Sequence, residues 1–332
     1  MGSGSPAGSH EVVPVGVTRR GVIAGVAVVV LVSCGGRSAP SLSAETASFD
    51  IAVGRNDRLM VGVSDNDGNV LVGGTVRFTV TPINGPGKKF VVSASFIAVP
   101  GRPAPSAQAK PRMVEPADGV GVYSAPNVTF PAPGPWEITV DAGGAGRAVT
   151  AVVVNEKHLV PMVGDKAPLT ENPTVNTPGV AAGVLDSSVK DASLADLTDR
   201  VLHTTSVDTA IAQHRPVVVV VSTPVYCVSR FCGPTTDQVA ALAPAYPKVT
   251  FIHLEVWKDF DKGQVSPFAA QWISPGADAT ADANEPWVFT VDASGVITKR
   301  WDDVLDVGAL TAELTRLVSS PDDQTQPVPG PR

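Results

Sequence analysis

Two cysteines in the second half of the chain are the residues best suited to chemistry. They are Cys227 and Cys232, and Gly233-Pro234 follows them directly. Proline favours the first turn of a helix, so we expect a helix to begin beside Cys232. A thiol at a helix N-terminus faces free N–H groups and the positive end of the helix dipole, which stabilise the thiolate. The pair is therefore a candidate for thiol–disulfide chemistry.

A disulfide between these cysteines requires a curled loop. On one continuous α-helix the two residues would lie about 140° apart around the axis and about 7.5 Å apart along it, beyond disulfide reach. Three interpretations stay open. The pair can exchange disulfides, with Cys232 attacking and Cys227 resolving, it can form a permanent structural bridge, or it can bind a metal.

The elements that must position the cysteines alternate between strands and helices. Residues 217–221 are an uninterrupted valine run, typical of a strand buried on both faces of a sheet. The predicted order is a strand at Pro216–Ser222, a helix at Pro234–Ala245, a strand at Val249–Val256, a helix at Pro267–Ile273, strands at Trp287–Val291 and Val296–Trp301, and a helix at Val307–Val318.

This order resembles the thioredoxin fold, and particular residues carry the resemblance. Phe231-Cys232-Gly233-Pro234-Thr235 is similar to the family's active-site motif W-C-G-P-C, and Glu285-Pro286-Trp287 resembles its cis-proline segment. Residues 163–168 are similar to the opening of membrane-tethered members of the family. The resemblance implies an α/β thioredoxin-like domain. Its catalytic residues would be Cys232, Cys227 and Pro286, with Pro286 as a cis-proline against the active-site sulfur.

The sequence also departs from that family. Thr235 stands where thioredoxins have their second cysteine, and residues 217–225 contain no carboxylate to act as a buried proton acceptor. The pair also resembles the C-x-x-x-C loop of copper-delivering relatives, but its spacing is longer and no histidine follows His253. His253 alternates with apolar neighbours in a predicted strand, which favours a sheet histidine over a metal ligand. We therefore expect no cofactor and assign no metal ligand, and copper handling by the cysteine pair stays a third alternative.

The region from Thr46 to Asn155 has the short alternating segments and turns of a β-sandwich. The predicted strands are Ser48–Val53, Leu59–Val63, Thr75–Thr81, Lys89–Ala98, Trp136–Val140 and Ala148–Val154, with an exposed loop at Pro100–Pro116. Residues 119–140 resemble the closing strands of immunoglobulin-like extracytoplasmic domains. Some such domains bind copper, but no histidine lies between Glu45 and Lys157. We therefore expect a spacer or protein-contact module.

The N-terminus has the order of an export signal. Arg19 and Arg20 precede an apolar run, Gly21–Ser33, of about thirteen residues, shorter than the roughly twenty that span a bilayer. The run ends in Leu31-Val32-Ser33-Cys34, which resembles a lipobox. This predicts cleavage before Cys34 and a lipid on its thiol, on the extracytoplasmic face of the cell membrane. The paired arginines resemble a twin-arginine signal, and the export route stays open.

Length and charge limit the remaining possibilities. A chain of 332 residues exceeds the roughly 250–300 residues at which single cores stop growing. A net charge of -7 without a basic cluster argues against nucleic acid as a partner. The expected partners are the membrane, through the lipid, and exported proteins. The predicted organisation is a signal peptide at 1–33, a tether at 34–45, an immunoglobulin-like sandwich at 46–156, a connector at 157–206, a thioredoxin-like domain at 207–320 and a disordered tail at 321–332.

Overall fold

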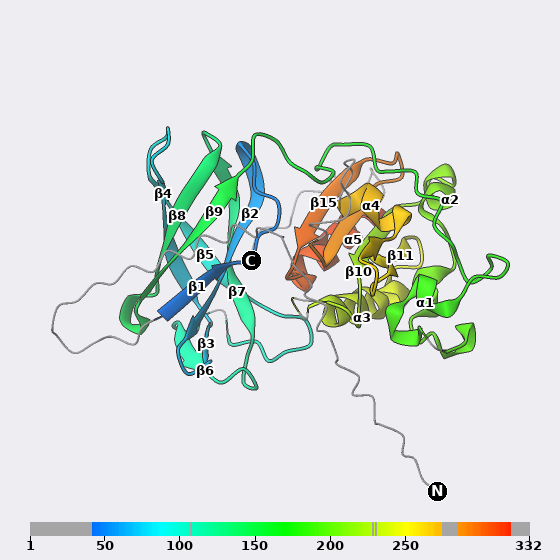
Figure 1. The fold of residues 1–332 in the computed structure, drawn as a ribbon, viewed down its shortest axis with the longest axis horizontal. Coiled ribbons are helices and arrows are strands. Elements are labelled where there is room, and N and C mark those ends of the chain that lie inside the picture. The colour runs from blue at the N-terminus through cyan, green and yellow to red at the C-terminus, as the bar shows by residue number, and fades with distance from the viewer. Residues whose placement is uncertain are drawn as a thin grey trace, which may run out of the picture. The chain divides into compact units, whose positions relative to one another are not determined.

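The fold is mixed and rich in β-sheet, with a β-rich N-terminal region (Figure 1). The computed structural model describes residues 42–106, 108–190, 192–227, 229, 231–273 and 284–319. All of them belong to one compact unit, Ala39–Arg332. The expectations for the signal peptide, for Cys34 and for the tail at 321–332 lie outside the described residues. Among those described, no helix has the length and apolar character needed to cross a membrane.

The N-terminal region forms a nine-stranded antiparallel sheet in the order β6-β3-β2-β7-β5-β4-β8-β9, with β1 paired to β2. The hydroxyl of Thr46 in β1 donates to the carbonyl of Ala151 in β9 at 3.0 Å, so the sheet bends back on itself. The strands are β1 (Leu42–Thr46), β2 (Gly54–Asp65), β3 (Val70–Val72), β4 (Thr75–Pro82), β5 (Phe90–Ala98), β6 (Arg112–Val114), β7 (Gly121–Phe130), β8 (Gly134–Asp141) and β9 (Arg147–Val154).

Alternating side chains explain why this sheet has an apolar interior. In β4, Val76, Phe78 and Val80 are buried while the residues between them are more exposed, which is the period-two pattern of a half-buried strand. Phe130 and Trp136 pack edge to face with ring centroids 5.4 Å apart inside the same core. Burial of these aromatic side chains holds the sheet together.

The predicted strand at Ser48–Val53 is wrong. The backbone amide of Phe49 donates to Asp302 Oδ2 at 2.9 Å, and that of Ala52 donates to Asn56 Oδ1 at 2.9 Å. Because side chains take these hydrogen bonds, the segment joins no sheet beyond one isolated bridge at Ala52. The predicted exposed loop at Pro100–Pro116 also contains a short strand, since β6 lies within it and pairs with β3.

The C-terminal region contains a four-stranded sheet in the order β11-β10-β14-β15. β10 (Val217–Ser222) runs parallel to β11 (Thr250–Glu255) and antiparallel to β14 (Trp287–Val291), which pairs antiparallel with β15 (Ile297–Asp302). Every residue of β10 is buried, as the valine run predicts. Its odd-numbered valines face one apolar core and its even-numbered valines face another.

Helices supply the apolar side chains that cover both faces. α2 (Val207–Ala212) and α4 (Pro267–Ile273) contribute to the core on one face, whereas α3 (Cys232–Leu242) and α5 (Val307–Val318) contribute to the core on the other. α4 and α5 have the predicted bounds, but α3 begins two residues before the predicted start. The predicted connector carries α1 (Ala182–Leu185) and the short 3-10 turns η2 (Ser187–Val189), η3 (Leu194–Asp196) and η4 (Arg200–His203); a small hairpin, β12 (Trp257–Asp259) and β13 (Gln264–Val265), was not predicted.

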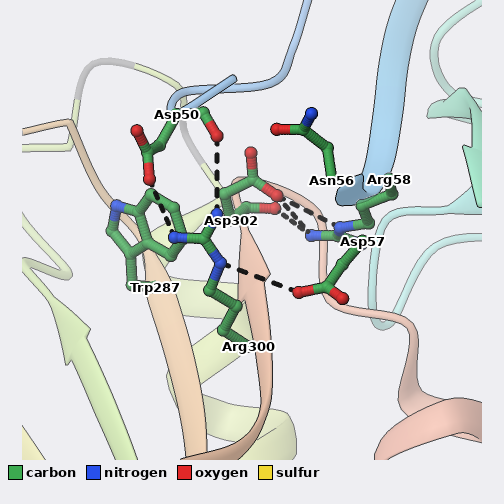
Figure 2. A pocket seen from close by; sticks show the side chains of 7 residues that line it. All are labelled: Asp50, Asn56, Asp57, Arg58, Trp287, Arg300 and Asp302. Carbon is green, nitrogen blue, oxygen red and sulfur yellow. Dashed lines mark hydrogen bonds and ion pairs between the residues drawn. The ribbon is translucent and has the colours of Figure 1, made fainter. Parts of the chain in front are cut away.

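A cluster of buried charges joins the two sheets (Figure 2). Arg300 Nη1 binds Asp50 Oδ2 at 2.8 Å, and Arg58 Nε binds Asp302 Oδ1 at 3.1 Å. Burial by itself raises the pKa of Asp50, but the hydrogen bond with His158 and the charge of Arg300 lower it overall. We call Asp50, Arg58, Arg300 and Asp302 the junction cluster. The space between them holds only about one water molecule. The cluster therefore fixes the two sheets together rather than forming a ligand site.

Candidate active site

The two cysteines form a disulfide where β10 leads into α3. Cys227 and Cys232 have Cα atoms 6.0 Å apart, within the usual range for a bridge. Cys232 is the first residue of α3, and Cys227 lies in the loop between strand and helix. The loop therefore curls, as a bridge between these positions requires.

The cysteines differ in exposure and in hydrogen bonding. Cys232 is completely buried, whereas Cys227 is partly exposed. The backbone amide of Cys232 donates to Cys227 Sγ at 3.3 Å. The first N–H group of α3 thus points to the Cys227 sulfur. This arrangement stabilises negative charge on Cys227 more directly than on Cys232.

The segment containing Pro286 lies next to the cysteine loop. The Glu285–Pro286 peptide bond is cis, which confirms the predicted conformation of this bond. Ser229 connects the two segments, because its hydroxyl lies 3.4 Å from Cys227 Sγ and 3.4 Å from the carbonyl oxygen of Glu285. Both predicted cysteines and the predicted proline segment are therefore brought together.

Two buried carboxyl groups near the disulfide were not predicted as site residues. A carboxylate oxygen of Glu285 lies within 4.8 Å of both cysteine sulfurs. Burial, followed by the charge of Glu255, raises the pKa of Glu285 to about 7. Burial, followed by the charge of Asp302, raises the pKa of Asp303 to about 8. Glu285 can therefore gain and lose a proton near neutral pH beside the sulfurs.

The position of Glu285 offered a signal that could have identified it. It directly precedes the predicted cis-proline, so a side chain there must lie close to the sulfur if the resemblance to thioredoxins holds. Residues 217–225 do lack a carboxylate, as noted from the sequence. In this structure the acidic groups are instead Glu285, just before β14, and Asp303, just after β15.

A wide groove opens beside the disulfide. Its volume is about 1080 Å³, and it is lined by Ser229, Phe231, Glu285 and Asp303 from the C-terminal region. The opposite wall includes β1 and parts of β2 and β7 from the N-terminal sheet. A groove of this size with mixed apolar and acidic walls can accept several residues of an extended polypeptide.

Thr235, at the position where the sequence resemblance would place a second cysteine, is buried one helical turn into α3. Its hydroxyl oxygen has no hydrogen-bond partner among the described residues. The sulfur that partners Cys232 instead comes from Cys227, upstream in the loop. No protein-family model, curated protein or solved structure matches the chain.

Proposed function

We propose that the protein catalyses thiol–disulfide exchange on exported polypeptides through Cys227 and Cys232. The observation that carries this proposal is the disulfide at the start of α3, in which the partly exposed Cys227 sulfur accepts the N–H of Cys232. This geometry stabilises a thiolate at the sulfur that an incoming molecule can reach.

The arrangement of the C-terminal elements supports a thioredoxin-like assignment. The strand order β11-β10-β14-β15, helices on both faces and a cis-proline before β14 agree with that fold. For the N-terminal sheet we keep the immunoglobulin-like interpretation. On this view the N-terminal region supplies one wall of the substrate groove in addition to acting as a spacer.

Burial favours Cys227, rather than Cys232, as the residue that meets the substrate. In the oxidising direction, a substrate thiolate attacks Cys227 Sγ, the protein disulfide breaks, and its electron pair leaves on Cys232. A second substrate thiolate then attacks the substrate sulfur of the mixed disulfide and releases Cys227 as a thiolate. The substrate is oxidised by two electrons to a disulfide, and the protein is reduced to a dithiol. Reduction of a substrate is the reverse sequence.

Glu285 is placed to move the proton that accompanies this exchange. When Cys232 leaves as a thiolate, a protonated Glu285 within 4.8 Å can donate to it, and in the reverse direction the carboxylate can accept that proton. Its pKa of about 7 makes both forms accessible near neutral pH. Asp303 lines the groove together with Glu285, and we call these two residues its acidic wall.

The first test is the reduction potential of the Cys227/Cys232 pair in the full chain carrying Cys34→Ser, in which no other thiol remains. Thiol trapping across glutathione ratios should give a reversible transition between roughly -120 and -270 mV, the range of known exchange catalysts. A bridge that stays closed below about -300 mV would instead indicate a structural disulfide.

The order of attack has its own test in a matched pair of variants. With a disulfide-containing protein as substrate, Cys232→Ser should accumulate a mixed disulfide on Cys227. Cys227→Ser should accumulate little, because the remaining thiol is completely buried. Trapping by Cys227→Ser alone would restore the order predicted from the sequence, with Cys232 as the attacking residue.

The second candidate function is a non-catalytic peptide-binding module with a permanent disulfide. The groove of about 1080 Å³ favours it, since such a surface can bind an extended segment without any exchange chemistry. The two candidates differ in the expected reduction potential of the cysteine pair. They also differ in whether a cysteine variant traps a substrate as a mixed disulfide. A binding module should hold a peptide in the groove without forming a mixed disulfide in either cysteine variant.

For localisation we propose a lipid anchor on Cys34 at the extracytoplasmic face of the cell membrane. The support is the order of arginines, apolar run and lipobox-like residues in the sequence. Cys34→Ser should release the protein from membranes or leave an uncleaved precursor in fractionated cells. An unchanged, processed and membrane-bound Cys34→Ser protein would contradict the anchor.

A further inference from the structure

A second cluster of ionisable side chains shares no member with the group formed by Cys227, Cys232 and Glu285. It consists of Asp186, Asp199, His203 and His253, whose ligand atoms all lie within 4.8 Å of one another. Three members come from the segment 186–203 and the fourth comes from β11. Asp186, His203 and His253 are each at most 3% exposed, so water cannot easily satisfy them.

Several polar atoms in this cluster have no hydrogen-bond partner among the described residues. They are His203 Nε2, His253 Nδ1 and Asp199 Oδ2. Such atoms are rare in native structures because an unpaired buried polar group costs about 1–3 kcal/mol. Two of them lie close to another member of the cluster, with His203 Nε2 3.5 Å from Asp199 Oδ2 and His253 Nδ1 3.8 Å from Asp186 Oδ2.

The hydrogen bonding of His253 defines which of its nitrogens is free. Its Nε2 lies 3.1 Å from the carbonyl oxygen of Ser222, which can only accept, so Nε2 carries the proton. In the neutral ring Nδ1 then presents a lone pair, and it faces Asp186 Oδ2 at 3.8 Å. Two electron-rich atoms so close together repel each other unless a proton or a cation lies between them. Metal-binding histidines usually donate the N–H of the ring nitrogen that does not bind the metal to a carbonyl or carboxylate, as His253 does here.

The distances are too long for direct hydrogen bonds. Asp199 Oδ2 lies 3.5 Å from His203 Nε2, and the Asp186–His253 pair is longer still. For four ligands at about 2.1 Å around a tetrahedral ion, neighbouring ligand atoms lie about 3.4 Å apart. The separations of the Asp199–His203 and Asp186–His253 pairs, 3.5 and 3.8 Å, are close to this ligand-to-ligand distance.

The net charge of the cluster agrees with a divalent ion. With neutral imidazoles, the two carboxylates supply the charge that one such ion balances.

We propose that Asp186, Asp199, His203 and His253 bind one Zn²⁺ or a chemically similar divalent cation in a closed, four-coordinate site. Two imidazoles and two carboxylates are ligands that Zn²⁺ accepts, and four protein ligands are typical of a structural rather than a catalytic zinc. The site needs no sulfur, and it is independent of the proposed exchange chemistry.

The proposed ion ties the connector to the sheet that carries the cysteine loop. Next to Asp186, Ser187 Oγ lies 3.3 Å from Thr223 Oγ1 and accepts the amide of Val225 at 3.3 Å. Thr223 and Val225 are in the loop that leads to Cys227. The ion therefore holds the segment on which the start of that loop rests.

The test uses the full chain with Cys34→Ser, oxidised and freed of metal by a chelator. Titration with Zn²⁺ alone should show one equivalent bound per chain and a higher thermal unfolding midpoint. Co²⁺ in its place should give the visible absorption of a four-coordinate ion. His253→Gln should weaken Zn²⁺ binding by more than about 100-fold, since even outer-shell changes cost 10–100-fold. The matched control is His214→Gln, which removes an exposed histidine outside the cluster and should bind as the parent does.

Two further variants keep the test decisive. If His253→Gln does not fold, Asp199→Asn, whose side chain is 12% exposed, replaces it in the same titration. Replacing Cys227 and Cys232 by serine should leave Zn²⁺ binding intact, because the sulfurs are not ligands. Absence of stoichiometric binding, binding that survives the change in His253 or Asp199, or binding lost with the cysteines would each overturn the proposal.

Discussion

The buried carboxyl groups of the junction cluster differ from those that line the groove. The former form ion pairs with arginine, whereas the latter have raised pKa values. Asp302 and Asp303 are adjacent and both buried, yet Asp302 pairs with Arg58 while Asp303 has a pKa raised to about 8. Asp50 and Glu285 differ in the same way, since Asp50 binds Arg300 and Glu285 has a pKa raised to about 7. Asp50 and Asp302 thus form direct ion pairs with a guanidinium, whereas Glu285 and Asp303, whose pKa values are raised, form no ion pair within the described part of the chain.

Removing an arginine from the junction cluster should have the largest effect. Arg300→Met leaves Asp50 buried without its cation, and breaking a buried pair in this way costs about 3–5 kcal/mol. The free energy of unfolding, measured with denaturant at pH 7, should fall by that amount. The control is Arg147→Met, because its pair with Asp141 is exposed on the arginine side and should change stability by less than about 1 kcal/mol. Equal losses in both variants would contradict the structural role of Arg300.

Glu285→Gln should slow exchange without removing either cysteine. The amide cannot move a proton, so we expect the rate at pH 7 to fall by up to about 100-fold. The pH profile of the rate should also lose its inflection near pH 7, the pKa of Glu285. Glu115→Gln, at an exposed position in the N-terminal region, serves as the control. A slower variant that keeps the inflection would show that Glu285 only positions the loop.

Asp303→Asn should change the dependence of stability on pH. The folded pKa of Asp303, about 8, lies above the unfolded value of about 3.9, so folding favours its protonated form. Its stabilising contribution is complete below about pH 4 and is lost, by up to about 1.4 kcal/mol per pH unit, as the pH rises to about 8. Denaturant titrations should therefore show a flatter profile for Asp303→Asn, with a gain of at least about 1 kcal/mol at pH 9.

Asparagine is a suitable replacement because Asp303 has a positive φ of 52°, a conformation that asparagine tolerates. Asp118→Asn, on an exposed turn, should leave the pH profile unchanged. The idea of an unpaired, protonated Asp303 would be abandoned if its variant and the wild type lost stability in parallel between pH 4 and 8.

The sequence predicted the elements whose signals are local. The valine run predicted β10, and α4 and α5 have the predicted bounds. It also predicted the pairing of Cys227 with Cys232 as one alternative and the conformation of the Glu285–Pro286 bond. The strand and helices depend on residue type and spacing within a few positions, whereas the conformation of the Glu285–Pro286 bond was implied by the resemblance to thioredoxins.

The features that were missed depend on residues far apart in the chain. Ser48–Val53 has the alternation of a strand, but Asp302, about 250 positions away, takes the amide of Phe49. The cluster that contains His203 and His253 was not recognised from the sequence. Its three connector residues approach β11 only when the chain folds. The i,i+4 spacing of Asp199 and His203 was the single local sign that two ligand types face the same way.

The valine run of β10 also leaves the alignment of that strand undetermined by its own side chains. Sliding β10 by one or two residues against β11 would still present valine to both faces, so apolar burial distinguishes such alignments poorly. The polar end of the strand removes the ambiguity. Ser222 Oγ lies 2.6 Å from Thr236 Oγ1, and the Ser222 carbonyl accepts from His253, so only one alignment satisfies both. Ser222 thus defines the register of a strand whose other residues are all valine. Replacing it would permit folded states in which β10 is shifted against β11 and buries the same apolar surface.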